Sequence, residues 1–191
     1  MLKYKITTPP ISEPVTLAEA KAHLRVLDTN EDVLIQSLIS AAREYAESVT
    51  GRAFVSRTIT AVCDSFPSGR SISLPVGPLI SVVSVNYTDK DNNTFSFTDF
   101  SADTFGNPPK LVLNTSASWP GAALLSVNPI QIVYRAGFES NSDIPATFKQ
   151  AILLLVGHWF EHREEVITGT ESYSVPFAAE ALLQQWRHPY T

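Results

Sequence analysis

Two histidines and a glutamate near the end of the chain have the types and spacing of a zinc site. His158, Glu161 and His162 form the pattern H-x-x-E-H, which is found in zinc peptidases of the inverted type. On a helix, two histidines four positions apart share one face and could bind zinc, with the glutamate as general base. A small zinc-dependent hydrolase is therefore one hypothesis for this chain.

The residues around this motif favour a structural role instead. Only 29 residues follow His162, too few for the domain that normally supplies a third zinc ligand. Trp159 and Phe160 indicate that the same part of the helix is used for packing. The other carboxylates of this region lie at the predicted helix end or beyond it: Glu164, Glu165, Glu171 and Glu180. We therefore predict no catalytic residue, no metal ligand and no cofactor.

Other common signs of catalysis are missing from the sequence. No G-x-S-x-G elbow accompanies its four histidines, and no glycine-rich phosphate-binding loop occurs. His23 is expected on a helix surface. Cys63, the one cysteine, falls in a predicted strand and is expected to be a buried apolar side chain rather than a nucleophile. A single cysteine excludes an internal disulfide framework and is typical of a protein that folds in a reducing cytosol.

The N-terminal part of the chain predicts two helices. The first begins at a capping box formed by Thr16 and Glu19. Its apolar residues recur at helical spacing: Leu17, Ala20, Leu24 and Leu27. The second helix runs from about residue 31 to 49 and has Gly51 as its C-terminal cap. Its charged residues are predicted to lie off the apolar face: Arg43, Glu44 and Glu47.

Residues 53–137 predict an antiparallel β module. β-branched and aromatic residues alternate there with polar ones, and turn signals follow one another at about 8–12 residues. The predicted strands span about residues 54–63, 71–74, 80–87, 94–97, 110–113 and 129–135. Helical sequence then returns, with a third helix from about residue 143 to 164 and a fourth that begins at Pro176.

Together these elements predict an α+β fold, in which an antiparallel β module is inserted into a small helical domain of about four helices. The expected boundaries are an extended, proline-rich arm at residues 1–15, helical segments at 16–52 and 138–191, and the β module at 53–137. Residues 165–175 are polar and are predicted to form a mobile loop.

Composition limits the partners that we expect. Charged residues make up 17% of the chain, against roughly 25% in typical soluble domains, which suits a subunit partly covered by neighbouring chains. The net charge is −5, and residues 136–191 carry seven acidic and three basic side chains. No basic stripe for reading nucleic acid is present. The longest apolar run, residues 151–157, is far shorter than the ~20 residues of a membrane span, and no secretory signal is expected at the N-terminus.

An ordered series of short segments resembles a known family. Residues 16–26, with the sequence TLAEAKAHLRV, are similar to the opening of tailed-bacteriophage head–tail connector (adaptor) proteins of the portal-binding, head-completion type. Further similar segments follow in order at residues 31–35, 41–47, 50–52, 74–79, 84–87, 133–138, 144–145, 151–154, 161–164, 175–176, 182–183 and 187. One departure is Trp159-Phe160, where the family usually has a tyrosine.

This resemblance implies a structural role in the neck of a virion. Adaptors of this family bind the portal protein after DNA packaging and form a homo-oligomeric ring, typically dodecameric, that extends the DNA channel. They then join the next connector, stopper or tail component, and DNA is only a passing occupant of the channel. Assembly would take place in the cytoplasm of the host bacterium. The low charge fraction is compatible with a closed ring of head-to-tail contacts, and an acidic C-terminal third would not grip phosphate.

The segments that we expect to contact partners lie at the two ends of the chain and in the polar loop. They are the N-terminal arm and the residues Tyr173, Trp186, Arg187, His188 and Tyr190. A third hypothesis is a monomeric binding module at the phage surface, whose β module recognises carbohydrate or protein. Four aromatic residues could line a sugar or nucleotide groove, but their alternation in a β module favours packing instead: Phe95, Phe97, Phe100 and Phe105.

Overall fold

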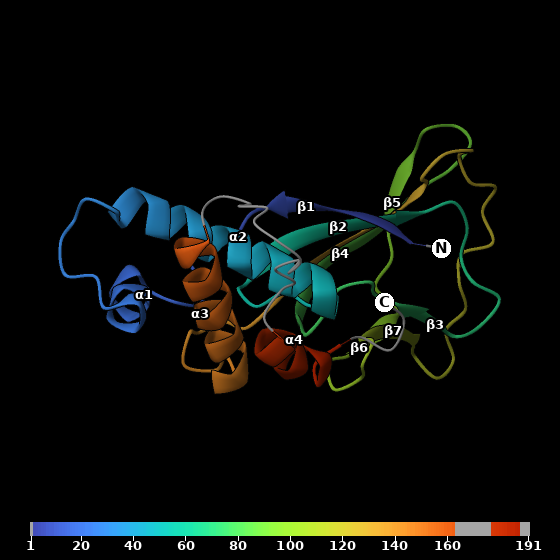
Figure 1. The fold of residues 1–191 in the computed structure, drawn as a ribbon. Helices are drawn as coiled ribbons and strands as arrows, with labels where there is room; N and C mark the ends of the chain where they lie inside the picture. The colour runs from blue at the N-terminus through green and yellow to red at the C-terminus, as the bar shows by residue number, and fades with distance from the viewer. Residues whose placement is uncertain (1, 163–176, 188–191) are drawn as a thin grey trace, which may run out of the picture. The chain divides into compact units, whose positions relative to one another are not determined.

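The computed structural model describes residues 2–162 and 177–187, which divide between two compact units (Figure 1). The sheet unit consists of Met1–Ile11 and Val55–Glu139, and the helical unit consists of Ser12–Phe54 and Ser140–Thr191. Because each unit is built from two separate stretches of sequence, the chain passes from one unit to the other three times.

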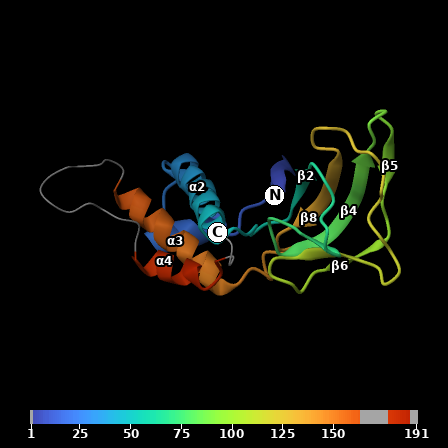
Figure 2. The same ribbon diagram turned by 90° about the vertical axis from the view of Figure 1, so that its right-hand side faces the viewer.

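The sheet unit contains an antiparallel five-stranded sheet with the order β1-β2-β8-β4-β5, of which β2, β8, β4 and β5 are labelled in Figure 2. Its strands are β1 (Lys3–Thr8), β2 (Arg57–Cys63), β4 (Leu79–Thr88), β5 (Thr94–Ser96) and β8 (Ile130–Ala136). A second, three-stranded sheet has the order β3-β7-β6. Its strands are β3 (Ser71–Ser73), β6 (Phe100–Asp103) and β7 (Lys110–Leu113).

The central strand β8 explains how the larger sheet is packed. Its alternate residues Ile130, Ile132, Tyr134 and Ala136 are fully buried, as expected for an antiparallel sheet with one face on the core. Tyr134 lies opposite Ile59 of β2, and its hydroxyl accepts a hydrogen bond from a backbone N–H of the same unit at 3.3 Å. Burial raises the pKa of the Tyr134 phenol, so that side chain is a neutral part of the core.

The helical unit contains α1 (Leu17–Leu24), α2 (Asp32–Thr50), α3 (Ala146–Glu161) and α4 (Phe177–Gln184). Helix α3 packs against the other three helices. The fully buried side chains of the unit come from all four helices and include Ala20, Ile35, Ile39, Ala42, Ala46, Phe148, Ile152, Leu155, Ala179 and Leu183. Among the helices of the described segments, none has both the length and the hydropathy that crossing a membrane requires.

Local signals in the sequence account for the starts and ends of these helices. The predicted capping box is present: Thr16 Oγ1 accepts from the Glu19 N–H at 3.2 Å, and the Thr16 N–H donates to Glu19 Oε2 at 2.7 Å. The hydrogen bond from the Thr16 backbone lowers the pKa of Glu19. Gly51 ends α2 in the left-handed conformation with φ 67°, which glycine adopts without strain.

Two helix ends differ from the prediction. Arg25 adopts a left-handed cap with φ 59°, so α1 ends at Leu24, and Leu27 is 96% exposed rather than part of the apolar face. Helix α3 ends at Glu161 instead of near residue 164, because His162 leaves the helical conformation at φ −112°, ψ 67°. The expected start of the last helix at Pro176 and the loop at 165–175 lie outside the described residues.

Two strands were missing from the prediction. Residues 3–8, expected in an extended arm, are extended but pair with β2 as an edge strand of the large sheet. All six residues of this strand are exposed, so no alternation of buried positions marks it in the sequence. Strand β6 also lacks fully buried residues, and its pairing with β7 defines it.

Candidate functional site

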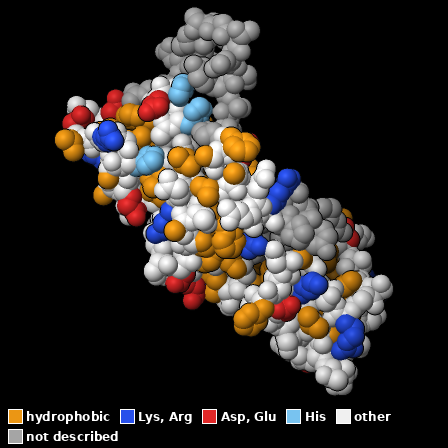
Figure 3. Space-filling model, turned by 60° about the horizontal axis from the view of Figure 1, so that its bottom comes forward, with side chains coloured by type: hydrophobic (Ala, Val, Ile, Leu, Met, Phe, Trp, Pro, Cys, Tyr) orange, Lys and Arg blue, Asp and Glu red, His pale blue; other side chains and the backbone are white. Residues whose placement is uncertain are grey.

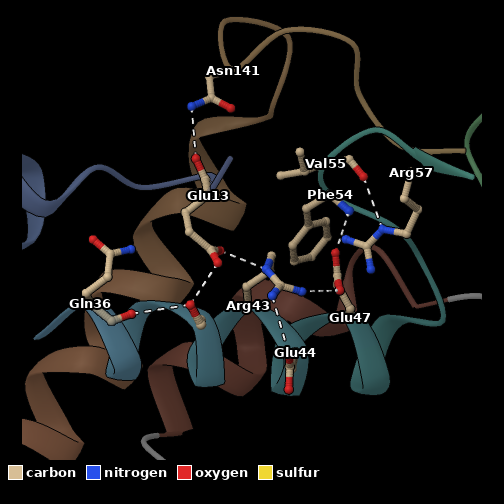
Figure 4. A network of polar contacts seen from close by, with 10 residues as sticks. Glu13, Gln36, Arg43, Glu44, Glu47, Phe54, Val55, Arg57 and Asn141 are labelled. Carbon is tan, nitrogen blue, oxygen red and sulfur yellow. Dashed lines mark hydrogen bonds and ion pairs between the residues drawn. The ribbon is translucent and has the colours of Figure 1, made fainter. Parts of the chain in front are cut away.

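A polar network around Arg43 organises the helical unit (Figure 4). Arg43 lies in α2, and only 7% of its side chain is exposed. Its Nε donates to Glu13 Oε2 at 2.7 Å, its Nη1 to Glu47 Oε2 at 3.0 Å and its Nη2 to Glu44 Oε1 at 3.3 Å. Glu13 also accepts a hydrogen bond from Ser40 Oγ at 2.8 Å. A single cation therefore satisfies three carboxylates, two of which come from α2 itself and are close in sequence.

The same network fastens all three connecting segments to α2. Glu13 follows the first passage between the units. Phe54 precedes the second passage, and its N–H donates to Glu47 Oε1 at 3.0 Å. Asn141 follows the third, and its Nδ2 donates to the Glu13 carbonyl oxygen at 3.0 Å. Burial opposes the charge of Arg43, but the hydrogen bonds and charges of Glu13 and Glu47 outweigh it and raise the pKa of the guanidinium.

Within the sheet unit, the second and third connecting segments are held against each other. Val55 and Phe138 form a parallel bridge, and the Ser56 N–H donates to the Phe138 carbonyl oxygen at 3.1 Å. Gly137 has φ +116°, and a β-carbon on it would lie 2.4 Å from the Val55 carbonyl oxygen. Arg135 Nη2 donates to Ser56 Oγ at 2.9 Å. Only glycine permits this close approach of two backbones.

Trp186, proposed on sequence grounds as a partner contact, is half-buried and makes contacts inside the helical unit. Its ring lies 5.1 Å from that of Phe148, and its Nε1 donates to Thr147 Oγ1 at 3.0 Å. Arg52 Nε donates to the Trp186 carbonyl oxygen at 2.7 Å, and its guanidinium carbon lies 5.9 Å from the centre of the Trp186 ring. Burial lowers the pKa of Arg52. The next residue, Arg187, is exposed, and these contacts fix the point at which it leaves the core.

The other predicted contact residues, Tyr173, His188 and Tyr190, lie outside the described residues. Two exposed apolar surfaces of the helical unit were not predicted. On α4, Phe177 is 84% exposed. Beside α1 lies a groove of about 820 Å³ lined by Leu17, Ala18, Lys21, Ala22, Arg25, Val26 and Leu27. Their signal in the sequence was weak, because short apolar helices are usually assigned to a core.

The histidine motif does not assemble the geometry of a metal site. The rings of His158 and His162 lie 4.7 Å apart, but His162 Nδ1 lies 2.9 Å from the His158 carbonyl oxygen. His23 of α1 lies against Gly157 of α3, so the described histidines share one region of the surface (Figure 3). Within residues 2–162 and 177–187, no group of three or more His, Cys, Asp or Glu side chains is placed to hold a metal ion.

The aromatic residues of the sheet unit mainly pack on one another. Phe97 is 7% exposed, and its ring lies 5.4 Å from that of Trp119 and 6.2 Å from that of Phe100. Phe95 stacks on Tyr87 at 5.3 Å and is 44% exposed. Of the four aromatic residues considered for a binding groove, the remaining one, Phe105, is fully exposed. The four therefore do not line one common groove.

The sequence of this chain matches a known protein family. The family model of the phage gp6-like head-tail connector proteins matches residues 14–97 and 124–187. This chain belongs to that family. Its function is that of a structural head–tail connector, as the resemblance in the sequence implied. The matched residues include all four helices and the strands β2, β3, β4, β5 and β8.

Solved structures with the same fold come from gene transfer agent (GTA) particles. A chain from the neck of an empty GTA particle, computed with C6 symmetry, superimposes with a TM-score of 0.79 at 23% identity, covering 97% of this connector and 95% of that chain. A chain from the virion of a native GTA particle gives 0.79 at 22% identity, covering 96% and 94%. A chain from the neck of a native particle, computed with C12 symmetry, gives 0.76 at 24%, covering 98% and 94%. No curated protein matches the connector's sequence.

The part of the connector outside the family match is also informative. The unmatched residues 98–123 contain β6 and β7, and β1 precedes the match. The Gly137 contact and the α2 residues of the Arg43 network lie within the matched residues, whereas Glu13 directly precedes them. The matched residues therefore hold most of the Arg43 network, whereas two of the three strands of the smaller sheet lie outside the match.

Proposed function

We propose that this connector is an adaptor subunit that docks on the portal protein, forms a ring around the DNA channel and joins the next connector, stopper or tail component. The match of the family model to both halves of the helical unit carries this proposal. The GTA necks that contain the same fold were computed with C6 and C12 symmetry, which supports a homo-oligomeric ring of twelve subunits in the neck of the virion. Assembly would take place in the host bacterial cytoplasm.

The helical unit is the part that forms the ring in this proposal, and the sheet unit decorates the outside or meets the next component. The three anchored connecting segments support this division, because they give the helical unit a fixed internal structure at each passage of the chain. DNA passes through the channel without specific contacts, in keeping with the acidic balance of residues 136–191. The proposed role includes no catalysis, metal or cofactor.

Partner contacts are proposed for Arg187 and for the surrounding C-terminal residues. Arg187 is exposed and directly follows Trp186, whose contacts position it. Tyr173, His188 and Tyr190 remain proposed contacts on sequence grounds, and Trp186 is proposed to act by holding the others in place rather than by touching a partner.

Binding to the portal protein of the same phage tests this function. The full-length chain and two deletion variants, lacking residues 188–191 or 165–175, would be mixed with purified portal and examined by native mass spectrometry without added metal. We expect a portal-bound ring of the full chain and reduced binding of both variants, with unchanged thermal unfolding of the free chains. A full-length chain that never binds portal contradicts the adaptor role, and one zinc ion per chain would favour the hydrolase.

A further inference from the structure

The helical unit carries two exposed apolar surfaces with opposite shapes. One is the groove beside α1, which includes Leu17, Ala22, Val26 and the 96% exposed Leu27. The other is the outer face of α4, where Phe177 projects from the first turn with 84% of its surface exposed. Ala181 lies four positions from Phe177 and therefore on the same face of α4, and both Ala178 and Ala181 are exposed. We call these surfaces the α1 groove and the α4 ridge.

The two surfaces belong to helices that pack on different sides of α3. On α1, His23 and Leu24 lie near Gly157 of α3, whereas the groove is lined by other residues of α1 and by the three residues that follow it. On α4, Ala179 and Leu183 are fully buried, whereas Phe177 points outward. Helices α1 and α4 accordingly lie on either side of α3 (Figure 1). One copy therefore cannot place its own ridge in its own groove.

The α1 groove carries a basic residue and the α4 ridge an acidic one. The groove is bordered by Arg25, which is exposed and makes no ion pair with any residue that the structure describes. The ridge carries Glu180, one turn from Phe177, and this carboxylate likewise has no ion-pair partner in the described segments. Glu180 is close enough to Tyr45 to raise the pKa of that phenol, after the larger effect of burial. A basic groove and an acidic ridge favour unlike surfaces meeting rather than like ones.

We infer that the α1 groove of one copy receives the α4 ridge of the next copy, with Phe177 in the groove and Glu180 beside Arg25. An amphipathic helix laid in an apolar groove is a common mode of recognition. Because groove and ridge are different surfaces on opposite sides of α3, the contact is heterologous, and repeating it generates a ring when the rotation closes. This inference rests on the proposed ring and names the surfaces that build it.

Two single variants of the full chain test the contact. Leu27→Asp removes the apolar groove and Phe177→Asp removes the ridge, while both sites are exposed enough for folding to be little affected. Each change should weaken one subunit contact at least about 30-fold, as expected at a central apolar residue of an interface. Phe105→Asp is the matched control, because Phe105 is fully exposed in the sheet unit and lies in neither surface.

A mixture of the two variants distinguishes this contact between unlike surfaces from a contact in which two copies meet through the same surface. Native mass spectrometry, with and without portal, should show rings for the wild-type chain and for Phe105→Asp, and monomers for each variant alone. The equimolar mixture should stop at dimers, because the intact ridge of Leu27→Asp fits the intact groove of Phe177→Asp and no second contact is left. Arg25→Glu and Glu180→Arg should each weaken assembly and restore it when combined. Rings formed by either aspartate variant overturn this contact, whereas a wild-type chain that forms no ring in either setting overturns the proposed function together with it.

Discussion

Arg43 and Glu13 are joined by a hydrogen bond of 2.7 Å although they lie 30 positions apart in the chain. Glu13 belongs to the segment that has just entered the helical unit, and Arg43 lies on the longest helix. Only 7% of the Arg43 side chain and 19% of the Glu13 side chain are exposed. The two charges are therefore stabilised mainly by each other rather than by water. This pair makes the start of the helical unit part of its core.

Replacement of Arg43 should therefore be strongly destabilising. Arg43→Ala removes the guanidinium that bonds to Glu13 and Glu47, and breaking such a buried network costs about 3–5 kcal/mol. Arg43→Lys keeps the charge but cannot serve three carboxylates in the same planar geometry, so an intermediate loss is expected. Glu44→Gln is the control, since 71% of the Glu44 side chain is exposed and such pairs contribute about 1 kcal/mol or less. Urea unfolding followed by helical circular dichroism measures all three, and equal losses for Arg43→Ala and Glu44→Gln would contradict this role.

Gly137→Ala should also lower stability, for a reason located in the backbone. The added β-carbon would lie 2.4 Å from the Val55 carbonyl oxygen, at a residue with φ +116°. Backbone strain of this kind costs on the order of 1–3 kcal/mol, and the clash with a neighbouring backbone adds to it. Gly121→Ala provides a comparison, because a β-carbon there meets nothing within 4 Å. Thermal unfolding should separate the two variants clearly, and an unchanged midpoint for Gly137→Ala would show that the two segments can move apart.

The capping box of α1 predicts a dependence of stability on pH. The backbone hydrogen bond from Thr16 lowers the pKa of Glu19 in the folded chain. Its contribution is therefore present above the unfolded pKa, near ~4.3, and is lost as the pH falls through the lower folded value. Glu19→Ala should cost about 0.5–1 kcal/mol at pH 7 and much less at pH 2, whereas Glu19→Gln should keep the hydrogen bonds without this dependence. Urea midpoints at the two pH values test the sign.

Substitutions of Trp186 and Arg187 should have different effects: the first should lower stability and the second should weaken binding to portal. Trp186→Ala removes the packing on Phe148 and the ring that faces the Arg52 guanidinium, but keeps the backbone carbonyl oxygen that accepts from Arg52. We expect a loss of about 2 kcal/mol, below the ~3–5 kcal/mol of a fully buried tryptophan. Arg187→Ala should change stability by less than about 0.5 kcal/mol but reduce binding to portal. Urea unfolding and portal binding measured on both variants test these two expectations. Normal portal binding by Arg187→Ala would show that Arg187 is not part of the proposed interface.

The elements that the sequence predicted well are those with local signals. The capping box of Thr16 and Glu19 and the glycine cap at Gly51 involve residues within one turn of a helix, so their spacing is sufficient evidence. Strand β1 has no such signal, because all its residues are exposed and its existence depends on pairing with β2, more than 50 positions away. Leu27 was misassigned because helical spacing continues past the left-handed residue Arg25, where the helix itself ends.

The candidate site was harder to predict for the same reason. Arg43 was expected off the apolar face of α2, as charged residues usually are, and the structure buries it through Glu13. Trp186 was proposed as a partner contact, and its contacts with Phe148 and Thr147 depend on residues far away in the sequence. Gly137 lay in a segment similar to connector proteins, yet its requirement for glycine follows only from the position of Val55.

The bridge between Val55 and Phe138 also bears on the order in which the chain folds. All residues between them belong to the sheet unit. In the sequence of the helical unit, this stretch is therefore one long insertion. Closing a loop of this length as an open coil carries an entropic cost that grows with the logarithm of its length. Once the strands have paired, the ends of the insertion already lie side by side, and α3 and α4 can join α2 as rapidly as if a short turn connected them. We therefore expect the helical core to be completed faster once the sheet has formed, and a substitution at Gly137 to slow the folding of the helical unit although Gly137 belongs to the sheet unit.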